Sequence, residues 1–415
     1  MDKLNKVLLN PALKLGADFD GWLATGGGLG LEAALAAPES VIACITAAEL
    51  RGMGGAGFPT GRKWDAAACA EGHRKYVVCN GNEDEPGTFK DSYLLRWTPH
   101  QVIEGALIAA LAIGADCIIL YINPHQADSI AEANRAASQW LGSTLLRRVE
   151  TVLGRPLEIK VVATSGRYIG GEETAVISSI EGGFPFPRRK PPFPAESGIS
   201  GMPTLINNIE TLANVCHILR HGADWYRAQG VGAASGTKLY SLSGDVLSPG
   251  LYELPMGTSL RELIFTYGGG MLEGKAFKAV FTGGPTNTLL TRKDLDVALD
   301  FESVRARNSR LGTGAMIVIS EGTSIVRKVA EYIEFFANAS CGQCPPCKCG
   351  TFQMARLLDR VDTGRSNPGD IEALRNLCRI LPGSGRCGLI YGAVTVVESS
   401  LYTFPEEYGL LDPAS

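Results

Sequence analysis

The sequence predicts an α/β domain, then a small α+β module, and finally a helical domain at the C-terminal end. In the first half, strand-like apolar runs alternate with helix-like segments, which is typical of a parallel sheet covered by helices. From about Lys238 the runs shorten and are separated by Ser-Pro-Gly and Gly-Gly-Gly turns. After Gly322, apolar residues recur at three- to four-residue spacing. We therefore expect four segments, 1–40, 41–235, 236–325 and 326–415.

Composition excludes several classes of protein. The chain has 415 residues, which at about 150 residues per domain leaves room for two to four domains. Hydrophobic residues make up 45% of it, so a disordered chain is excluded. With 39 basic and 43 acidic residues the net charge is −4, which offers no cationic surface to nucleic acid. The 50 glycines indicate many turns that lie close to another group.

The longest apolar stretch runs from Val102 to Ile122, but Glu104 and Asp116 interrupt it. Because charges are costly inside a bilayer, we interpret the stretch as a helix over 101–112 and a buried strand over 117–122. The N-terminus has no sustained apolar core, so we expect no secretory signal and a cytoplasmic location. In a reducing compartment, eleven cysteines indicate metal binding rather than disulfides.

The segment Gly52-Met53-Gly54-Gly55-Ala56-Gly57 fits the G-x-G-x-x-G pattern of dinucleotide-binding turns. Its context differs from a Rossmann turn, because a capped helix beginning at Ser40 precedes it and Phe58-Pro59-Thr60 is a poor helix opening. Arg62 and Lys63 then place two cations beside a loop of free backbone N–H groups, a combination that suits a phosphate. A structural loop without a ligand is the alternative.

Polar side chains gather at the end of a strand predicted over 76–79. They are Asn80, Asn82, Glu83, Asp84 and Glu85. Loops at the carboxyl ends of parallel strands bind ligands in α/β folds. We therefore expect a binding site here, with an acidic surface turn as the alternative.

Two later motifs also indicate ligand contacts. Gly170 and Gly171 run into a helix that opens with adjacent carboxylates, where an ordinary helix start is the alternative. The segment Lys190-Pro191-Pro192-Phe193-Pro194 fixes an aromatic ring on a stiff backbone, and two asparagines follow close behind.

Six of the cysteines are crowded into the last quarter of the chain. Three of them form C-x2-C-x2-C, a spacing that places thiolates around one face of an iron–sulfur cube; they are Cys341, Cys344 and Cys347. For the fourth ligand we expect Cys387, in a glycine-rich loop, rather than Cys349, which should point away, or Cys378, which should lie in the core. The sequence thus predicts a [4Fe–4S] cluster, with structural zinc as the alternative.

Taken together, the motifs resemble the NADH-binding flavoprotein subunits of respiratory complex I and the related diaphorase subunits of soluble hydrogenases, formate dehydrogenases and aldehyde oxidoreductases. The resemblance covers about residues 40 to 400, and the motifs occur in that family's order. They are the glycine loop through Trp64, Cys79-Asn80, 85–91, Gly171-Glu172-Glu173-Thr174, 190–195, 207–212, the cysteine triplet and Cys387. The resemblance implies an α/β flavin- and NADH-binding domain, a β-grasp-like (SLBB) module and a helical bundle around one [4Fe–4S] cluster.

The resemblance also implies roles for individual residues. Four glycines would lie against the flavin phosphate and let NADH approach; they are Gly52, Gly54, Gly55 and Gly57. The residues expected to hold the flavin are Lys63, Asn80, Asn82, Glu83, Asn207, Asn208 and Thr211. Those expected beside its isoalloxazine ring are Tyr168, Gly171 and Glu172. Phe58 would stack on the adenine of NADH, Glu85 and Glu173 would position the nicotinamide or its ribose, and Phe193 completes the predicted set.

The sequence departs from the family at several positions. Asn82 stands where aspartate is usual and Gly170 where cysteine is usual, so the charge and redox potential of the flavin pocket are expected to differ. Ala66 replaces an aromatic residue that completes the adenine site. This leaves both FMN and FAD open as the flavin.

We therefore predict an electron-input (diaphorase) subunit that transfers hydride between NADH or NAD and a bound flavin, and single electrons between flavin and cluster. Its expected partners are iron–sulfur electron-transfer subunits, with no nucleic acid and no membrane span. A soluble dehydrogenase complex is the expected setting, and respiratory complex I is the alternative. Rival hypotheses are a zinc-stabilised docking module without catalysis and a flavin enzyme whose small molecule is not NADH.

Overall fold

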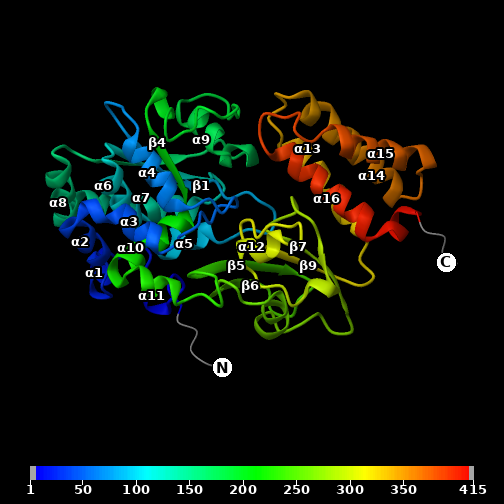
Figure 1. Cartoon of the computed structure of the whole chain (residues 1–415), viewed down its shortest axis with the longest axis horizontal. Helices are drawn as coiled ribbons and strands as arrows, with labels where there is room; N and C mark the ends of the chain where they lie inside the picture. The colour runs from blue at the N-terminus through cyan, green and yellow to red at the C-terminus, as the bar shows by residue number, and fades with distance from the viewer. Residues whose placement is uncertain (1–5, 411–415) are drawn as a thin grey trace.

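The computed structural model describes residues 6–410, which form three parts in chain order (Figure 1). A parallel sheet with its helices, drawn in blue to green, comes first, and a second sheet follows in green to yellow. A group of helices, in orange to red, ends the chain. The predicted succession of an α/β domain, an α+β module and a helical domain is confirmed. The limits between these parts stay predictions.

The first sheet has four parallel strands in the order β3-β2-β1-β4. They are β1 (Tyr76–Gly81), β2 (Cys117–Ile122), β3 (Glu158–Ala163) and β4 (Thr204–Asn208). β2 is buried along its whole length, as expected for an apolar strand covered on both faces. The chain moves outward from β1 to β3 and then returns to the other side of β1 for β4. In open α/β sheets, ligands bind beyond the carboxyl ends of the strands at such a reversal.

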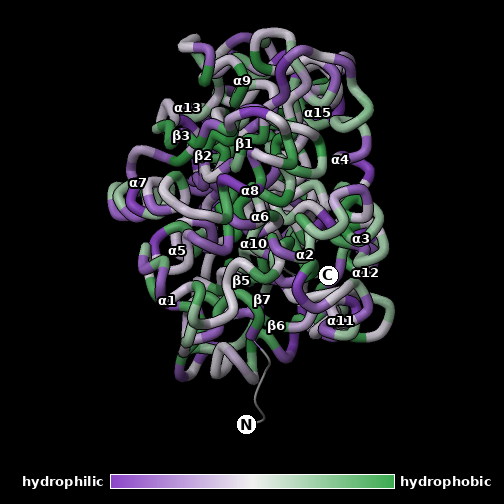
Figure 2. The backbone as a smooth tube through the Cα atoms, turned by 90° about the vertical axis from the view of Figure 1, so that its left-hand side faces the viewer, coloured by the Kyte–Doolittle hydropathy of each residue, from purple (hydrophilic) through white to green (hydrophobic). Residues whose placement is uncertain are grey.

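The helices of this part pack closely against one another and the sheet. They are α1 (Phe19–Ala24), α2 (Leu29–Ala36), α3 (Val41–Ala47), α4 (Thr60–Cys69), α5 (Asp91–Trp97), α6 (Pro99–Ile113), α7 (Ala127–Gly142), α8 (Thr144–Leu153), α9 (Glu173–Ile180), α10 (Ile209–His221) and α11 (Ala223–Arg227). Where α6 meets α10, a Cβ on Gly105 would lie 1.9 Å from the Leu212 carbonyl oxygen, so only glycine permits this contact. Figure 2 shows hydrophobic residues around β1, β2 and α6, and a stretch of hydrophilic residues at the edge labelled α7.

Most of the predicted elements of the first part are present. The strand over 117–122 is found with the predicted limits, and α6 extends the predicted helix by a few residues. The helix after Ser40 is confirmed, but its predicted cap is wrong. The Ser40 hydroxyl donates to the Ala37 carbonyl (2.8 Å) at a 3-10 turn, Pro38–Ser40, and its oxygen accepts no hydrogen bond from the N–H groups at the start of α3.

The second sheet is mixed, in the order β6-β5-β9-β7-β8. Its strands are β5 (Thr237–Gly244), β6 (Gly250–Pro255), β7 (Phe277–Thr282), β8 (Leu290–Thr291) and β9 (Ala315–Ser320). β5 and β9 are parallel and the other pairs antiparallel. A π-helix, Glu262–Tyr267, and α12 (Phe301–Arg305) lie in the connections. The N-terminal segment is bound here, because the N–H groups of Val7, Leu8 and Leu9 donate to the buried Glu253 carboxylate on β6 at 2.8 to 3.0 Å.

The last part is helical, as predicted. Its helices are α13 (Ile325–Ala339), α14 (Phe352–Asp362), α15 (Pro368–Ile380) and α16 (Leu389–Thr403), with a π-helix, Pro346–Thr351, before α14. The spaced apolar residues of α13, including Val329, Ile333 and Phe336, are buried in its core. Lys278 of β7 pairs with Glu407 and so joins the second sheet to this part.

Within residues 6–410, no single helix has both the length and the apolar character needed to cross a membrane. One bent pair, Leu29–Ala36 with Pro38–Ala47, meets these criteria together, with an angle of 102° between its halves.

Candidate functional site

The glycine loop lies between α3 and α4 and rests on the end of β4. The N–H of Gly52 donates to the Phe58 carbonyl (2.9 Å), which closes the loop, and the N–H of Met53 donates to the Thr211 hydroxyl (2.8 Å). A Cβ on Gly54 would lie 3.0 Å from the Cβ of Asn208 at the end of β4. A Cβ on Gly55 would meet no atom within 4 Å. The loop therefore lies close to the reversal point of the sheet and leaves open space beside its backbone.

The surroundings of this loop differ in part from the prediction. The expectation that Phe58-Pro59-Thr60 is a poor helix opening is wrong, because α4 begins at Thr60 with Pro59 immediately before it. Proline is tolerated at a helix start, where the N–H groups have no partner within the helix. The element before the loop is α3 rather than a strand, so the interpretation that this is not a Rossmann turn is confirmed.

A cavity of about 300 Å³ opens at the carboxyl ends of β1 and β4. Half of the predicted cofactor-binding residues line it: Gly54, Asn80, Asn82, Glu83, Glu85, Tyr168, Gly171, Glu172 and Asn208. The structure thus brings together residues from four separate segments, the glycine loop, 80–85, 168–172 and 207–212, at the reversal point of the sheet. The other predicted residues lie outside this lining: Gly52, Gly55, Gly57, Phe58, Lys63, Glu173, Phe193, Asn207 and Thr211.

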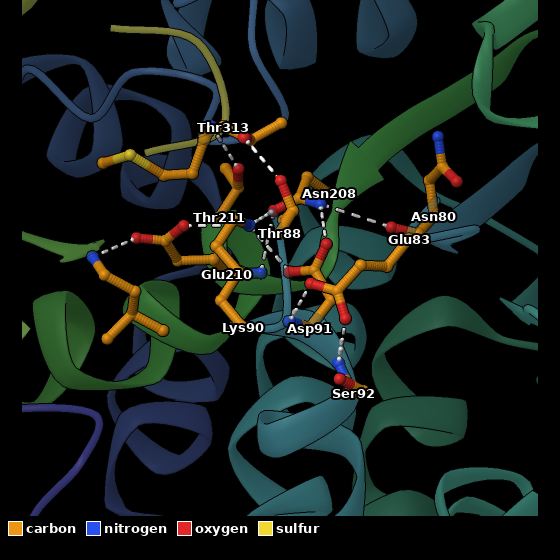
Figure 3. Close-up of polar contacts among 12 residues, drawn as sticks. Asn80, Glu83, Thr88, Lys90, Asp91, Ser92, Asn208, Glu210, Thr211 and Thr313 are labelled. Atoms are coloured by element: carbon orange, nitrogen blue, oxygen red, sulfur yellow. Dashed lines mark hydrogen bonds and ion pairs between the residues drawn. The ribbon is translucent and has the colours of Figure 1, made fainter. Parts of the chain in front are cut away.

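Glu83 is held at the N-terminus of α5 (Figure 3). Its carboxylate accepts hydrogen bonds from the N–H groups of Asp91 (2.7 Å) and Ser92 (3.0 Å), which face it from the first turn of the helix. Burial and the negative charge of Asp91 raise the pKa of Glu83, while Lys90 and these hydrogen bonds oppose the rise. The helix start thus fixes a carboxyl group at the cavity wall.

Two asparagines at the carboxyl end of β1, Asn80 within the strand and Asn82 just after it, join the strand to the segment before α9. The Asn80 side-chain amide donates to the Gly171 carbonyl (2.9 Å), and that of Asn82 donates to the Arg167 carbonyl (3.0 Å). The Oδ1 atom of Asn82 is buried and has no hydrogen-bond partner among residues 6–410. A buried polar atom without a partner at a cavity wall indicates that a polar ligand or water completes it.

Glu85 and Tyr168 form a partly buried pair in the same cavity. The Tyr168 hydroxyl donates to Glu85 Oε2 (2.6 Å), whereas Glu85 Oε1 has no partner within the described part of the chain. Burial raises the pKa of Glu85 to about 7, although the bond from Tyr168 lowers it. Gly284 of the second module packs against this carboxyl group, since a Cβ there would lie 2.1 Å from Oε1.

Lys63, Glu173 and Lys190 form a cluster of charges. Lys63 Nζ lies 2.9 Å from Glu173 Oε2, and Lys190 Nζ lies 2.6 Å from Glu173 Oε1. Burial alone would raise the pKa of Glu173, but the two ammonium groups lower it to about 2. Glu172 acts as the N-cap of α9, accepting from the N–H of Thr174 (2.9 Å), and also lines the cavity. Glu172 therefore combines the two roles that the sequence left as alternatives, the start of a helix and a residue of the site.

The remaining predicted residues either hold the loop or lie at the surface. Asn207 Oδ1 accepts a hydrogen bond from the indole of buried Trp64 (2.8 Å), so its side chain fixes α4 against β4. Thr211 holds the glycine loop through Met53, as described above. Phe58 and Phe193 are about half exposed, at 48% and 50%. Such exposed rings remain available for a planar ligand.

The predicted cluster ligands line a second cavity. Cys341, Cys344, Cys347 and Cys387 share it with apolar and polar neighbours including Ile169, Pro187 and Leu389. Cys349 is exposed and Cys378 is buried in the helical core, as expected. Cys347 and Cys387 are 40 positions apart in the sequence, and the fold brings them to the same cavity.

The spacing of these thiols bears on the choice between zinc and an iron–sulfur cluster. A zinc ion bound at about 2.3 Å by each sulfur requires sulfurs about 3.8 Å apart. Among residues 6–410, no three His, Cys, Asp or Glu side chains are gathered closely enough to share one metal ion. Four thiols around one cavity are the set of ligands that a [4Fe–4S] cube requires.

The two cavities share a wall. Ile169, Cys387 and Leu389 line both of them. A cluster held by Cys387 would therefore lie directly beside a ligand in the first cavity.

Several lining residues were missed by the sequence analysis. Thr286, Arg310 and Thr313 reach the first cavity from the second module, and Gly388 and Gly392 reach it from the start of α16. Their sequence signals were weak: a glycine-rich turn at Gly283 and Gly284, and the glycine-rich loop around Cys387. Contacts between modules leave no local periodicity.

Comparisons with known proteins agree with this geometry. A family model described as the Nuo51 FMN-binding domain matches residues 45–217, and an SLBB domain model matches 239–286. A model described as the NADH-ubiquinone oxidoreductase-F iron-sulfur binding region matches 327–410. An NADH-quinone oxidoreductase subunit of Rhizobium meliloti is 41% identical over 376 residues, which cover 89% of this chain and 88% of the relative. The chain belongs to this family of flavoprotein subunits.

Other members of the family come from hydrogenases. The NADP-reducing hydrogenase subunit HndC of Solidesulfovibrio fructosivorans is 40% identical over 391 residues, covering 94% of this chain and 80% of the relative. A chain in the crystal structure of an NAD+-reducing [NiFe]-hydrogenase in the H2-reduced state superposes with a TM-score of 0.82. Its sequence identity is 34%, and the match covers 95% of this chain and 67% of that one.

Membership of the family confirms the predicted class of protein. The chain is a diaphorase-type NADH-binding flavoprotein with an FMN domain, an SLBB module and a [4Fe–4S] region. FMN is the flavin of the matched domain, which resolves the choice between FMN and FAD. The relatives are subunits of multi-subunit complexes, so other subunits are implied as partners.

Proposed function

We propose that this chain is the electron-input subunit of a dehydrogenase complex, with the nucleotide and FMN bound over β1 and β4 and the cluster bound by the four thiols. The observation that carries this proposal is the shared wall made by Ile169, Cys387 and Leu389. Electrons that enter at the flavin cavity would then leave by the shortest route, through Cys387 to the cluster. Bound FMN accepts a hydride and releases electrons singly, which is the chemistry that such a pair of sites requires.

For FMN, we assign some residues to direct contact with the cofactor and others to holding the surrounding loop and helix in place. Gly54, Asn80, Asn82, Glu83 and Asn208 line the cavity and would contact the cofactor, while Tyr168, Gly171 and Glu172 would lie along its ring. The unpartnered Oδ1 of Asn82 supports a polar ligand at this place. The loop glycines Gly55 and Gly57 would offer N–H groups to the phosphate, with Lys63 nearby as its cation, while Gly52 would act by closing the loop through its bond to the Phe58 carbonyl. Asn207 and Thr211 would act by holding α4 and the loop in place.

For NADH, the proposed contacts are Glu85, Glu173, Phe58 and Phe193. Glu85 has an unpartnered oxygen in the cavity and Glu173 is fixed between two lysines, so both carboxyl groups are held before a nucleotide arrives. The two exposed rings would receive the adenine. The chain's task is then to align the nicotinamide with the flavin.

The finer identity of the partners is also a proposal. We propose an iron–sulfur electron-transfer subunit as the acceptor and a soluble, cytoplasmic dehydrogenase complex as the setting. The similarity to the NAD+-reducing hydrogenase chain supports this choice, while the comparable identity to NADH-quinone oxidoreductase subunits keeps respiratory complex I as the alternative.

Replacement of Cys387 by serine tests the proposal at its central point. We expect Cys387→Ser to lose most of its iron and the electron paramagnetic resonance signal of the reduced cluster, because serine is a poor ligand for this cluster. The FMN content and the bleaching of flavin by NADH should persist, since Cys387 lies at the edge of the first cavity and forms no part of the glycine loop.

Cys349→Ser is the matched control, because Cys349 is two residues from a ligand and exposed. It should keep both the iron and the resonance signal. Full iron content in Cys387→Ser, or loss of iron in Cys349→Ser, would refute the assignment of the fourth ligand.

A further inference from the structure

Lys90, Glu210 and Lys238 form a buried chain of charges beside the flavin cavity; Figure 3 shows the first two with their neighbours. Lys90 Nζ lies 2.9 Å from Glu210 Oε2, and Lys238 Nζ lies 2.8 Å from the same oxygen. Lys90 also pairs with Asp91 at 2.7 Å. The side chains of Lys90, Glu210 and Lys238 are at most 1% exposed.

These charges come from different parts of the molecule. Lys90 immediately precedes α5 and Glu210 lies in the first turn of α10, so both belong to the FMN domain. Lys238 lies on β5, the first strand of the SLBB module. The adjacent N–H of Leu239 donates to Glu210 Oε1 (2.8 Å). Both oxygens of Glu210 are therefore bound by the start of the module.

The chain of charges continues into the cavity wall. Lys238 Nζ donates to the Thr313 carbonyl (3.0 Å), and the Thr313 hydroxyl lies 2.8 Å from that of Thr88. On the other side, Lys90 donates to Asn208 Oδ1 (2.9 Å), and the Asn208 amide donates to Asp91 (2.6 Å). Thr88, Asp91, Asn208 and Thr313 all line the cavity.

Buried ion pairs of this kind are a poor source of stability, because the cost of removing the charges from water offsets their attraction. Apolar side chains of similar volume would stabilise the interface equally well. What the charges add is a fixed geometry, since each bond has a required distance and direction. Here the charges fix the position of the segment 310–314. The same segment contacts the glycine loop through an isolated β-bridge between Gly312 and Gly55.

We propose that Lys238 is a positioning residue that, with Glu210, holds the segment 310–314 of the SLBB module against the flavin cavity. The module then supplies Thr313 and Arg310 to the site. Arg310 lines the cavity, and its Cζ atom lies over the Tyr391 ring, 5.3 Å from the ring centroid. Its guanidinium would offer N–H groups to an anionic phosphate of FMN or the nucleotide. This inference rests on the proposed site of FMN.

The test compares Lys238→Met with the wild type, both as full chains freed of FMN. Hydrogen exchange of the amides in 310–314 should become faster in the variant, because the bond that fixes the Thr313 carbonyl is lost. The dissociation constant for added FMN should rise about tenfold, the effect of one charged hydrogen bond. The exchange measurement requires no cofactor and no activity.

Lys278→Met is the matched control. Lys278 lies on β7 of the same module and likewise donates to a backbone carbonyl, that of Thr323 (2.8 Å), but it contacts the helical part instead of the cavity. It should leave both the exchange of 310–314 and FMN affinity unchanged. If both variants alter them equally, Lys238 is merely structural and the proposal is overturned.

A double variant covers the case in which Lys238→Met does not fold because Glu210 retains only one cation. Glu210→Gln with Lys238→Met removes one charge of each sign, so it leaves Lys90 paired with Asp91. It should fold, exchange faster at 310–314 and bind FMN more weakly. Exchange and affinity like those of the wild type would overturn the proposal. A wild type that binds no FMN would overturn the proposed function instead, and the exchange rates would still decide the role of Lys238.

Discussion

At the scale of single residues, Glu85 shows how the fold prepares a carboxyl group for a redox site. Burial raises its pKa to about 7, one oxygen is bound by Tyr168, and the other has no partner among residues 6–410. A neutral carboxyl group tolerates the extra negative charge of a reduced flavin nearby, whereas an ionised one repels it. The protonation of Glu85 should therefore influence flavin reduction near neutral pH.

Glu85→Gln tests this through the pH dependence of stability. Because the folded pKa lies above the ordinary value of 4.5, the stabilising contribution of Glu85 is complete below pH 4.5 and is lost as the pH rises to about 7. The full loss amounts to at most about 3 kcal/mol. The melting temperature of the wild type should thus fall relative to that of Glu85→Gln between pH 4.5 and 7, and the difference should stay constant above.

Glu104→Gln is the control for this prediction. Burial also raises the pKa of Glu104 to about 7, but Glu104 binds Trp22 and the N–H groups of Gly28 and Leu31, away from the cavity. It should change the stability profile in the same way and leave the pH profile of flavin reduction by NADH unchanged. Glu85→Gln should change both profiles; if it changes neither, Glu85 is ionised in the folded protein.

The cavity residues that could be predicted from sequence lie next to one another at the end of a single strand. Asn80, Asn82 and Glu83 lie at the carboxyl end of β1, and the carboxyl end of a parallel strand is where α/β proteins bind ligands. Arg310 and Thr313 could not be found in this way, because they reach the cavity from another module. The binding partners of Asn207 and Lys63 were also beyond prediction, since Trp64 and Glu173 approach them only in the folded chain.

At the scale of elements, the turn after β7 brings the SLBB module onto the FMN domain. Gly284 lies in this turn with φ of +94°, and a Cβ there would lie 2.1 Å from Glu85 Oε1. Two requirements therefore meet at one glycine, a left-handed backbone and the close approach of a carboxyl group.

Gly284→Ala should lower stability by roughly 1 to 2 kcal/mol through backbone strain and should also displace Glu85. We expect a lower melting temperature and slower reduction of flavin by NADH. Gly322→Ala is matched in strain, with φ of +86°, but its Cβ would meet no atom within 4 Å. It should lower the melting temperature alone. Equal rates of flavin reduction in the two variants would show that the turn does not position Glu85.

Elements with a clear local pattern were predicted well, and those that depend on distant pairing were not. The strand over 117–122 was found from its unbroken apolar run between Gly114 and Pro124. The helix at Thr60 was missed because Pro59 was interpreted as an obstacle, although proline is tolerated before the first turn. The order of the second sheet pairs β5 with β9, residues more than 70 positions apart, which no local pattern reveals.

At the scale of the whole molecule, the three parts meet around two adjoining cavities. The FMN domain supplies most of the first cavity, the SLBB module adds Arg310 and Thr313, and the helical part adds Cys387, which also faces the second cavity. The sequence predicted the three parts and the cluster ligands, because cysteine spacing is a strong local signal. The shared wall depends on how the parts pack, and the electron transfer proposed above depends on this contact.

The most direct test of the account is the absorption spectrum of the anaerobically purified chain before and after addition of NADH, with the released flavin identified by chromatography and iron and zinc quantified. An electron-input subunit should show an FMN band that NADH bleaches, above the broad absorption of an iron–sulfur cluster, in a protein that contains iron. A colourless protein that contains zinc without iron, or a flavin band that NADH leaves unchanged, would contradict it.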